Sequence, residues 1–97
     1  MPRYITLLNW TDQGIRNVKD SPARLDSAKE FFRSMGADIK EFYLVKGQYD
    51  MVIIIDAPDE ETVAKLALAT GAQGAVRTVT LRAFTEDEYR RIIAALP

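Results

Sequence analysis

The order of its regular segments is the feature that most limits the folds open to this chain. Four short runs rich in β-branched and aromatic residues alternate with stretches of helical periodicity. The runs cover residues 4–10, 39–46, 49–56 and 76–84, and the helical stretches cover 15–19, 21–35, 57–70 and 85–96. The two middle runs join around Gly47 and Gln48, which predicts a β-hairpin. The expected order is therefore β-α-β-β-α-β followed by a further helix.

That order is the split βαβ arrangement of ferredoxin-like α+β folds. Right-handed crossovers predict an antiparallel sheet in the order 4-1-3-2, with both central helices on one face. A length of 97 residues lies within the range of one domain and leaves no room for a second hydrophobic core. We therefore predict a single domain over residues 1–97.

Capping residues mark the expected helix ends. Ser21 followed by Pro22 predicts a helix start, because proline suits the first helical position. Gly36 predicts the end of that helix, and Gly71 predicts the end of the next one. Residues 85–88 read threonine, glutamate, aspartate, glutamate, which is the spacing of a capping box. They predict the start of the last helix.

The chain contains no cysteine and no histidine. Disulfides, thiolate nucleophiles, zinc sites and histidine bases are therefore excluded. Any acid–base chemistry would fall to Asp, Glu, Lys or Tyr. We expect no cofactor and no metal.

Charge and hydropathy restrict the partners. The formal net charge is −1 and acids and bases are interspersed, so no basic surface is expected to neutralise the phosphates of a nucleic acid. No apolar run approaches the roughly 20 residues that a membrane span needs. We expect neither nucleic acid nor membrane as a partner, and a cytoplasmic location.

Side chains alternate along a strand, so each strand has two faces, and we expect the more apolar set to pack under the helices. The set assigned to the helix side is Ile5, Leu7, Phe42, Leu44, Val52, Ile54, Val79, Leu81 and Ala83. The opposite face then carries Thr6, Leu8, Trp10, Ile39, Glu41, Tyr43, Val45, Tyr49, Met51, Ile53, Ile55, Thr78, Thr80, Arg82 and Phe84. This face is too apolar to remain in water.

A second copy of the chain is the simplest cover for that opposite face, because twofold homodimers are the commonest soluble assemblies. On this assignment Ile53→Lys, in a central strand, is expected to break the dimer. The polar minority includes Glu41, Tyr43 and Arg82. In one interpretation Glu41 and Arg82 form an ordinary interface ion pair. In the other, a partly hydrated space between two curved sheets is lined by Glu41, Tyr43, Thr78, Thr80 and Arg82.

Four segments of the chain form a recognisable set, namely residues 10–15 (WTDQGI), 21–24 (SPAR), 47–50 (GQYD) and 80–85 (TLRAFT). With these segments the chain resembles the GYD domain family. The resemblance covers nearly the whole chain in order, with the naming tripeptide lengthened by one glutamine. It implies a dimeric α+β barrel from bacteria or archaea, and it implies no established activity.

The topology brings three chain segments to one end of the sheet. Trp10 and Thr11 end the first strand there, the hairpin at residues 47–50 turns there, and residues 75–78 begin the last strand there. These segments are expected to cluster.

Strand parity places Asp50, Asn9 and Arg77 side by side in this cluster, on the helix side of the sheet. One interpretation is a structural lock in which Asp50 accepts hydrogen bonds from Arg77 or from the backbone amides of residues 11–14. In the other, Arg77 and the free amides of the helix start hold an anionic group such as a carboxylate.

Aromatic and basic residues supply the remaining candidates. Trp10 and Tyr49 are expected on the dimer side, either at a pocket mouth or as plain interface packing. Arg24 is a family-motif position that contacts a ligand, anchors the strand ends or is a surface charge. The candidate ligand-binding residues are Trp10, Thr11, Arg24, Tyr43, Tyr49, Asp50, Arg77 and Arg82. No catalytic residue is identified.

Three functions remain open from the sequence. The first is a small-ligand-binding or regulatory homodimer, with a pocket between or beside the packed sheets. The second is a cofactor-free enzyme of the monooxygenase or isomerase type, which rests on analogy of fold; Tyr49 or Asp50 inside an enclosed pocket would favour it. The third is a protein-interaction module that uses one face of the last helix, where Tyr89, Ile92, Ile93 and Leu96 recur at helical spacing.

Overall fold

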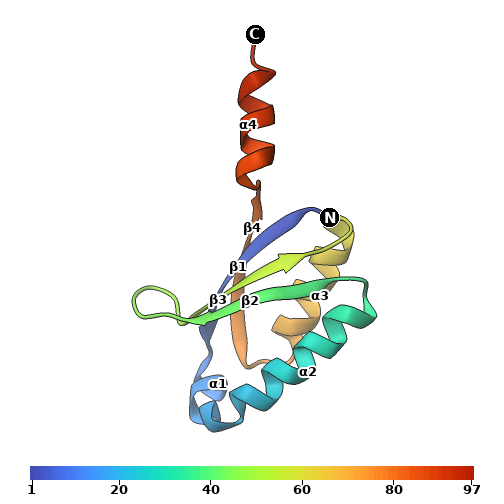
Figure 1. Ribbon diagram of the computed structural model, residues 1–97. Coiled ribbons are helices and arrows are strands. Elements are labelled where there is room, and N and C mark those ends of the chain that lie inside the picture. Colours follow the sequence, from blue (N-terminus) through green and yellow to red (C-terminus); the bar gives the residue numbers. More distant parts are fainter.

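Four antiparallel strands form the sheet in the computed structural model, which describes residues 1–97 (Figure 1). They are β1 (Arg3–Trp10), β2 (Asp38–Leu44), β3 (Met51–Asp56) and β4 (Val76–Ala83). Their order is β2-β3-β1-β4, which is the predicted order counted from the other edge. The ferredoxin-like α+β fold is confirmed.

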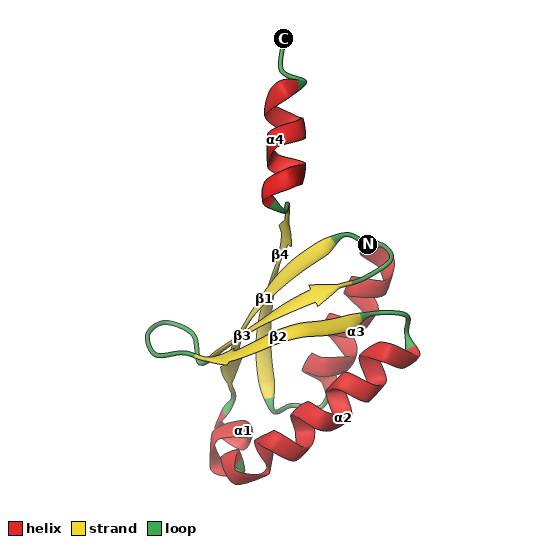
Figure 2. Cartoon of the chain, in the orientation of Figure 1, coloured by secondary structure: helices red, strands yellow, loops and turns green.

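Two main helices cover one face of this sheet (Figure 2). They are α2 (Ser21–Ser34) and α3 (Glu60–Ala72). A short α1 (Asp12–Arg16) and a 3₁₀ turn, η1 (Val18–Asp20), lead from β1 into α2. The last helix, α4 (Glu86–Ala94), continues past the end of β4 and stands away from the sheet and the other helices (Figure 1). Even α2, the longest of them, falls short of the length and apolarity needed to traverse a bilayer.

The helix ends agree with the capping signals in part. The capping box is confirmed, because the Thr85 hydroxyl accepts from the Glu88 amide at 3.2 Å and the Thr85 amide donates to the Glu88 carboxylate at 2.9 Å. Gly36 follows α2 with φ of 80°, as a helix stop requires. The prediction for Gly71 was wrong: α3 runs through it, and Gly74, with φ of 84°, follows the helix. The helix start at Ser21 and Pro22 is confirmed, but Ser21 is the first residue of α2 and the capping position is Asp20.

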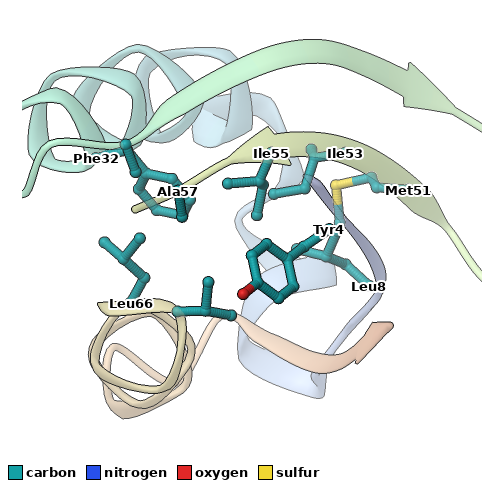
Figure 3. Close-up of a cluster of buried hydrophobic side chains, with 10 residues drawn as sticks. Tyr4, Leu8, Phe32, Met51, Ile53, Ile55, Ala57 and Leu66 are labelled. Atoms are coloured by element: carbon teal, nitrogen blue, oxygen red, sulfur yellow. The ribbon is translucent and has the colours of Figure 1, made fainter. Parts of the chain in front are cut away.

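The hydrophobic core lies between the sheet and the two main helices. Alternate residues of the central strands point into it, namely Tyr4 and Leu8 from β1 with Met51, Ile53 and Ile55 from β3 (Figure 3). Phe32 of α2 and Leu66 of α3 close the cluster from the helix layer. We call the side of the sheet that carries these residues the helix face.

The predicted faces were wrong for β1, β3 and β4. Leu8, Ile53 and Ile55 are buried against the helices, whereas they were expected on the opposite side. Both sets of side chains are apolar, so hydrophobicity alone does not select between them. The packing of the helices selects the face that is buried. On that face the hydroxyl of the buried Tyr4 donates to Glu60, in the first turn of α3, at 3.0 Å.

Strand β2 is the partial exception. Phe42 and Leu44 lie opposite Ile53 and Met51, so they share the helix face as predicted. Ile39 was expected on the other face, yet it lies opposite the buried Ile55. A register irregularity between Ile39 and Glu41 shifts the alternation by one residue.

The other side of the sheet, which we call the open face, carries no helix (Figure 1). Its apolar residues come from the three strands β1, β3 and β4 and are Ile5, Leu7, Val52, Ile54, Val79 and Leu81. Val79 and Leu81 are each 47% exposed in the single chain. An uncovered apolar face therefore exists as the sequence suggests, but it is the face first assigned to the core.

One end of the open face is tied by a bidentate ion pair. Arg3 donates to Asp56 through Nε at 2.9 Å and through Nη2 at 3.1 Å, across the β1–β3 register. The Arg3 hydrogen bond holds the pKa of the Asp56 carboxyl below its ordinary value. The pair joins the two central strands at the start of β1.

This pair predicts a pH dependence of stability. Because the folded-state pKa of Asp56 is lowered, its stabilisation is complete above the unfolded-state pKa of about 3.9 and is lost as the pH falls through the folded-state value. Asp56→Asn should therefore lower the free energy of unfolding at neutral pH, and the difference from the native chain should shrink on acidification. Urea titrations at neutral and acidic pH measure this. A difference that stays constant with pH, or an equal effect of Asp26→Asn at an exposed carboxylate, would contradict the assignment.

Candidate functional site

A cavity of about 300 Å³ lies between α2 and the helix face of the sheet. Strands β1, β2 and β3, helix α2 and the segment from the end of α3 to the start of β4 all contribute to its walls. The lining residues are Leu8, Trp10, Ser21, Pro22, Arg24, Leu25, Ala28, Phe32, Ile39, Phe42, Met51, Ile53, Thr70, Gln73, Ala75 and Val76. Eleven of the sixteen are apolar. A site of this kind suits a mainly apolar ligand.

The geometry of α2 and β2 creates this space. Leu25, Ala28 and Phe32 recur at helical spacing on the side of α2 that meets the sheet. The irregularity in β2 brings both Ile39 and Phe42 to the same wall. Ala28 has a small side chain at the middle of this helix surface, so the layer does not close completely.

Arg24 is the one ionisable residue in the cavity wall. Its Nη1 donates to the backbone carbonyl of Asn17 at 3.2 Å. Its Nη2 is buried and has no hydrogen-bond partner, and it is the one buried side-chain nitrogen or oxygen of the chain in that condition. Because buried polar groups are nearly always paired, this unpaired donor needs an explanation.

The strand ends beside the cavity are locked by Asp50. Its Oδ2 accepts from the Trp10 backbone amide at 3.0 Å and lies 3.4 Å from Nδ2 of Asn9. The same Asn9 nitrogen donates to the Gln48 carbonyl at 3.0 Å. These bonds tie the β2–β3 loop to the end of β1. Asp50 is therefore a paired structural carboxylate, but its partners are the Trp10 amide and Asn9 rather than the predicted Arg77 or the amides of residues 11–14.

The polar row predicted from strand parity, Asp50 with Asn9 and Arg77, differs from the prediction in two respects. Asn9 lies opposite Arg77 in the β1–β4 register, so the three residues are neighbours as expected. The row lies on the open-face side, however, because Asn9 shares the alternation of Leu7 rather than that of Leu8. Arg77 is exposed and makes no ion pair with Asp50.

Thr11 fixes α1 to the start of β4. Its hydroxyl donates to the Gly74 carbonyl and accepts from the Gly14 amide at 3.1 Å, and its amide donates to the Ala75 carbonyl at 3.1 Å. Gly14 is buried in this contact, and a Cβ there would lie 1.9 Å from the Ala75 carbonyl oxygen. The expected clustering of residues 10–11, 47–50 and 75–78 is confirmed.

The remaining predicted site residues lie elsewhere. Tyr49 is half-buried in the β2–β3 loop and does not line the cavity. Tyr43, on the open-face side of β2, donates to Glu41 at 2.6 Å, and this hydrogen bond raises the pKa of the Tyr43 phenol. No group of three or more carboxylates lies in a position to hold a metal ion.

Arg82 lies on the helix face, at the opposite end of the sheet from the cavity. Its guanidinium carbon is 4.5 Å from the centre of the Phe84 ring and 5.5 Å from that of Tyr4. Its Nη2 is 3.9 Å from the Glu88 carboxylate in α4. Pairing between Arg82 and Glu41 is excluded within the chain, because they project from opposite faces of the sheet. The structure thus brings Trp10 and Arg24 into one cavity wall and separates them from Tyr43 and Arg82.

A sequence profile of the GYD domain matches residues 4–93. The chain belongs to the GYD domain family. A relative of this GYD domain in Thermus thermophilus is 36% identical over 84 residues, which cover 86% of this chain and 88% of the relative. That protein is named as a glutamine synthetase and cystathionine beta-lyase binding protein.

Solved structures agree with the fold of the GYD domain. The leucine response regulatory protein of Mycobacterium tuberculosis matches with a TM-score of 0.62 and 20% identity over 89% of this chain, which spans 54% of that protein. A protein from Thermus thermophilus matches with 0.55 and 23% identity over 88% of this chain and 95% of its own. A hypothetical protein from Pyrococcus horikoshii matches with 0.56 and 19% identity over 89% and 93%. At these identities the likeness concerns the fold.

Removing the Asp50 carboxylate should loosen the strand ends of the GYD domain. Asp50→Ala leaves the Trp10 amide and the Asn9 side chain without their acceptor, so we expect a loss of about 1–2 kcal/mol of unfolding free energy. Asp50→Asn should cost less, because an amide oxygen still accepts one of these bonds. Chemical denaturation of both variants measures the order. Asp26→Ala, at an exposed carboxylate of α2, is the control, and an equal loss there would refute the lock.

Proposed function

We propose that this GYD domain is a homodimeric regulatory module that acts by binding another protein. Two uncovered apolar surfaces offer sites for two partners. The open face of the sheet suits a second copy of the chain, and helix α4 suits the target protein.

The open face favours a second copy because it is apolar at its centre and carries its charged residues at its ends. Its centre consists of the six apolar residues given above. Arg77 at one end is exposed and makes no ion pair, so it can keep its hydration at the rim of a contact. Arg3, Asp56 and Asp50 already have partners in the chain, since Arg3 pairs with Asp56 and Asp50 accepts from the Trp10 amide. A twofold contact over the centre of the face would therefore bury apolar surface without leaving these three charges unpaired.

Helix α4 is the observation that carries the protein-binding role. Tyr89, Ile92, Ile93 and Leu96 form one stripe at the end of the chain, and each is between 45% and 62% exposed. No residue of α4 is buried, and the helix stands away from the rest of the chain (Figure 2). A helix of 9 residues is marginal in water by itself, so its apolar side gains stability by docking into a groove of a partner.

The relative from Thermus thermophilus supports this role. Its name describes a protein that binds two enzymes, glutamine synthetase and cystathionine beta-lyase. Similarity over 86% of this chain makes enzymes of these two classes the first targets to test. The enzyme hypothesis gains no such support, because neither Tyr49 nor Asp50 lines the cavity.

The test measures binding of the full chain to glutamine synthetase and to cystathionine beta-lyase, each purified from the organism that produces this chain. We expect saturable binding to at least one of them, and at least tenfold weaker binding by the double variant Ile92→Glu with Leu96→Glu. Leu68→Glu, the same kind of change on the exposed side of α3, is the control and should bind normally.

Two results would contradict the proposal. Absence of binding to both enzymes would remove the proposed target class. A change of solution mass in the double variant would show that α4 belongs to the contact between copies.

A further inference from the structure

We infer that the cavity under α2 binds a small apolar carboxylate, with the carboxylate held by Arg24 and the apolar part lying among the walls of the sheet and helix. This site lies on the helix face, away from the open face and from α4. The inference goes beyond the protein-binding role and does not depend on it.

The size and lining of the cavity define the apolar part of the ligand. Its volume of about 300 Å³ is at the lower end of small-molecule sites, which span about 300–1,000 Å³. At roughly 30 Å³ for a water-sized group, it holds about ten non-hydrogen atoms. With most of the wall apolar, a short aliphatic chain or one substituted ring fits better than a sugar or a nucleotide. Octanoate has this size.

Arg24 defines the polar end of the ligand. Its guanidinium is oriented by the bond from Nη1 to the Asn17 carbonyl, which leaves the buried Nη2 free. A planar guanidinium matches a carboxylate, and a charge-assisted bond would supply the acceptor that Nη2 lacks. A neutral alcohol of the same length would offer the buried Nη2 a weaker, uncharged acceptor. Charge complementarity therefore selects an anionic head group.

The cavity has an exposed rim. Pro22 at the start of α2, Phe42 of β2 and Gln73 after α3 line it and are exposed. Ser21, Thr70 and Gln73 add hydroxyl and amide groups to the cavity wall. A ligand can thus enter from solvent with its chain inward.

Trp10 makes the site measurable in the unmodified protein. It is the one tryptophan of the chain and it lines the cavity, so its fluorescence reports on what occupies the space. Titration of the full chain with octanoate should give a saturable change in Trp10 emission, and calorimetry should give one site per chain. Neutral 1-octanol should bind at least tenfold more weakly than octanoate.

Three variants separate the site from its surroundings. Arg24→Gln should weaken octanoate at least tenfold while leaving octanol unchanged. Ala28→Leu adds bulk to the cavity wall and keeps Arg24 in place, and it should abolish binding of both while the thermal midpoint stays the same or rises. Arg77→Gln, at an exposed arginine, is the matched control and should bind octanoate normally.

The outcomes decide the inference without reference to the enzyme targets. No saturable binding of octanoate, equal binding of octanoate and octanol, or normal octanoate binding by a folded Ala28→Leu variant would each overturn it. The double variant Ile92→Glu with Leu96→Glu gives a further test. If octanoate bound this variant and not the native chain, the inference would be overturned, because α4 of a second copy would then occupy the cavity in the native protein.

Discussion

Leu7→Lys is expected to convert the proposed dimer into a folded monomer. Leu7 lies at the centre of the open face, between Val52 of β3 and Val79 of β4 in the strand register. Burial of an unpaired lysine in a sheet-to-sheet contact costs several kcal/mol, which corresponds to at least about a hundredfold weaker association. In the single chain this face meets solvent, so the ammonium stays hydrated and the fold survives. Sedimentation velocity over a concentration series measures the change.

Leu68→Lys is the matched control for this prediction. Leu68 lies on α3 and is 75% exposed, so the same substitution there introduces the charge on a surface outside the proposed contact. It should leave the solution mass unaltered. If both variants stay dimeric, the contact does not involve the open face. Ile53→Lys does not serve as a test, because Ile53 is part of the core and a lysine there is expected to unfold the chain.

Gly14→Ala is expected to destabilise the domain by about 3 kcal/mol or more, beyond the usual range of overpacking. The added Cβ would lie 1.9 Å from the Ala75 carbonyl oxygen and 2.9 Å from its carbon, and backbone atoms cannot move aside as a flexible side chain can. Helix α1 must then shift away from β4. That shift breaks the bond from the Thr11 amide to the Ala75 carbonyl, which joins these two segments.

Gly71→Ala is the control, since Gly71 lies inside α3 and, apart from its chain neighbours and the backbone of its own helix, nothing lies within 4 Å of the position of an alanine methyl group there. Alanine is the better helix former, so this variant should gain up to about 1 kcal/mol. If the packing account is correct, urea unfolding will show a lower unfolding free energy for Gly14→Ala and a higher one for Gly71→Ala than for the native chain. A Gly14→Ala protein as stable as the native chain would refute it.

The order and type of the elements could be predicted because local signals specify them. Thr85 and Glu88 define a capping box through their own hydrogen bonds, and Gly36 takes the left-handed conformation that ends α2. The faces could not be predicted in the same way. Strand β3 reads Met51, Val52, Ile53, Ile54 and Ile55, which is apolar on both sides, so the choice depends on the packing of distant helices.

The candidate site shows the same division. Parity and topology placed Asp50 next to Asn9 correctly, because the pairing of neighbouring strands fixes which residues are adjacent. The cavity gives no local signal in the sequence. It depends on how closely α2 approaches the sheet at Ala28 and on the irregularity in β2 that turns Ile39 inward. Arg24 was identified as a candidate from its family-motif position. Its buried, unpaired Nη2 could not be predicted, because it depends on the folded structure around the side chain.

The mass of the unmodified chain in solution tests the central proposal most directly. Each chain has a mass of 10.9 kDa. Sedimentation equilibrium at micromolar concentration is predicted to give twice that mass, because the open face is then buried against a second copy. A single species of 10.9 kDa at every concentration, from a folded protein, would contradict the proposal that the open face joins two chains.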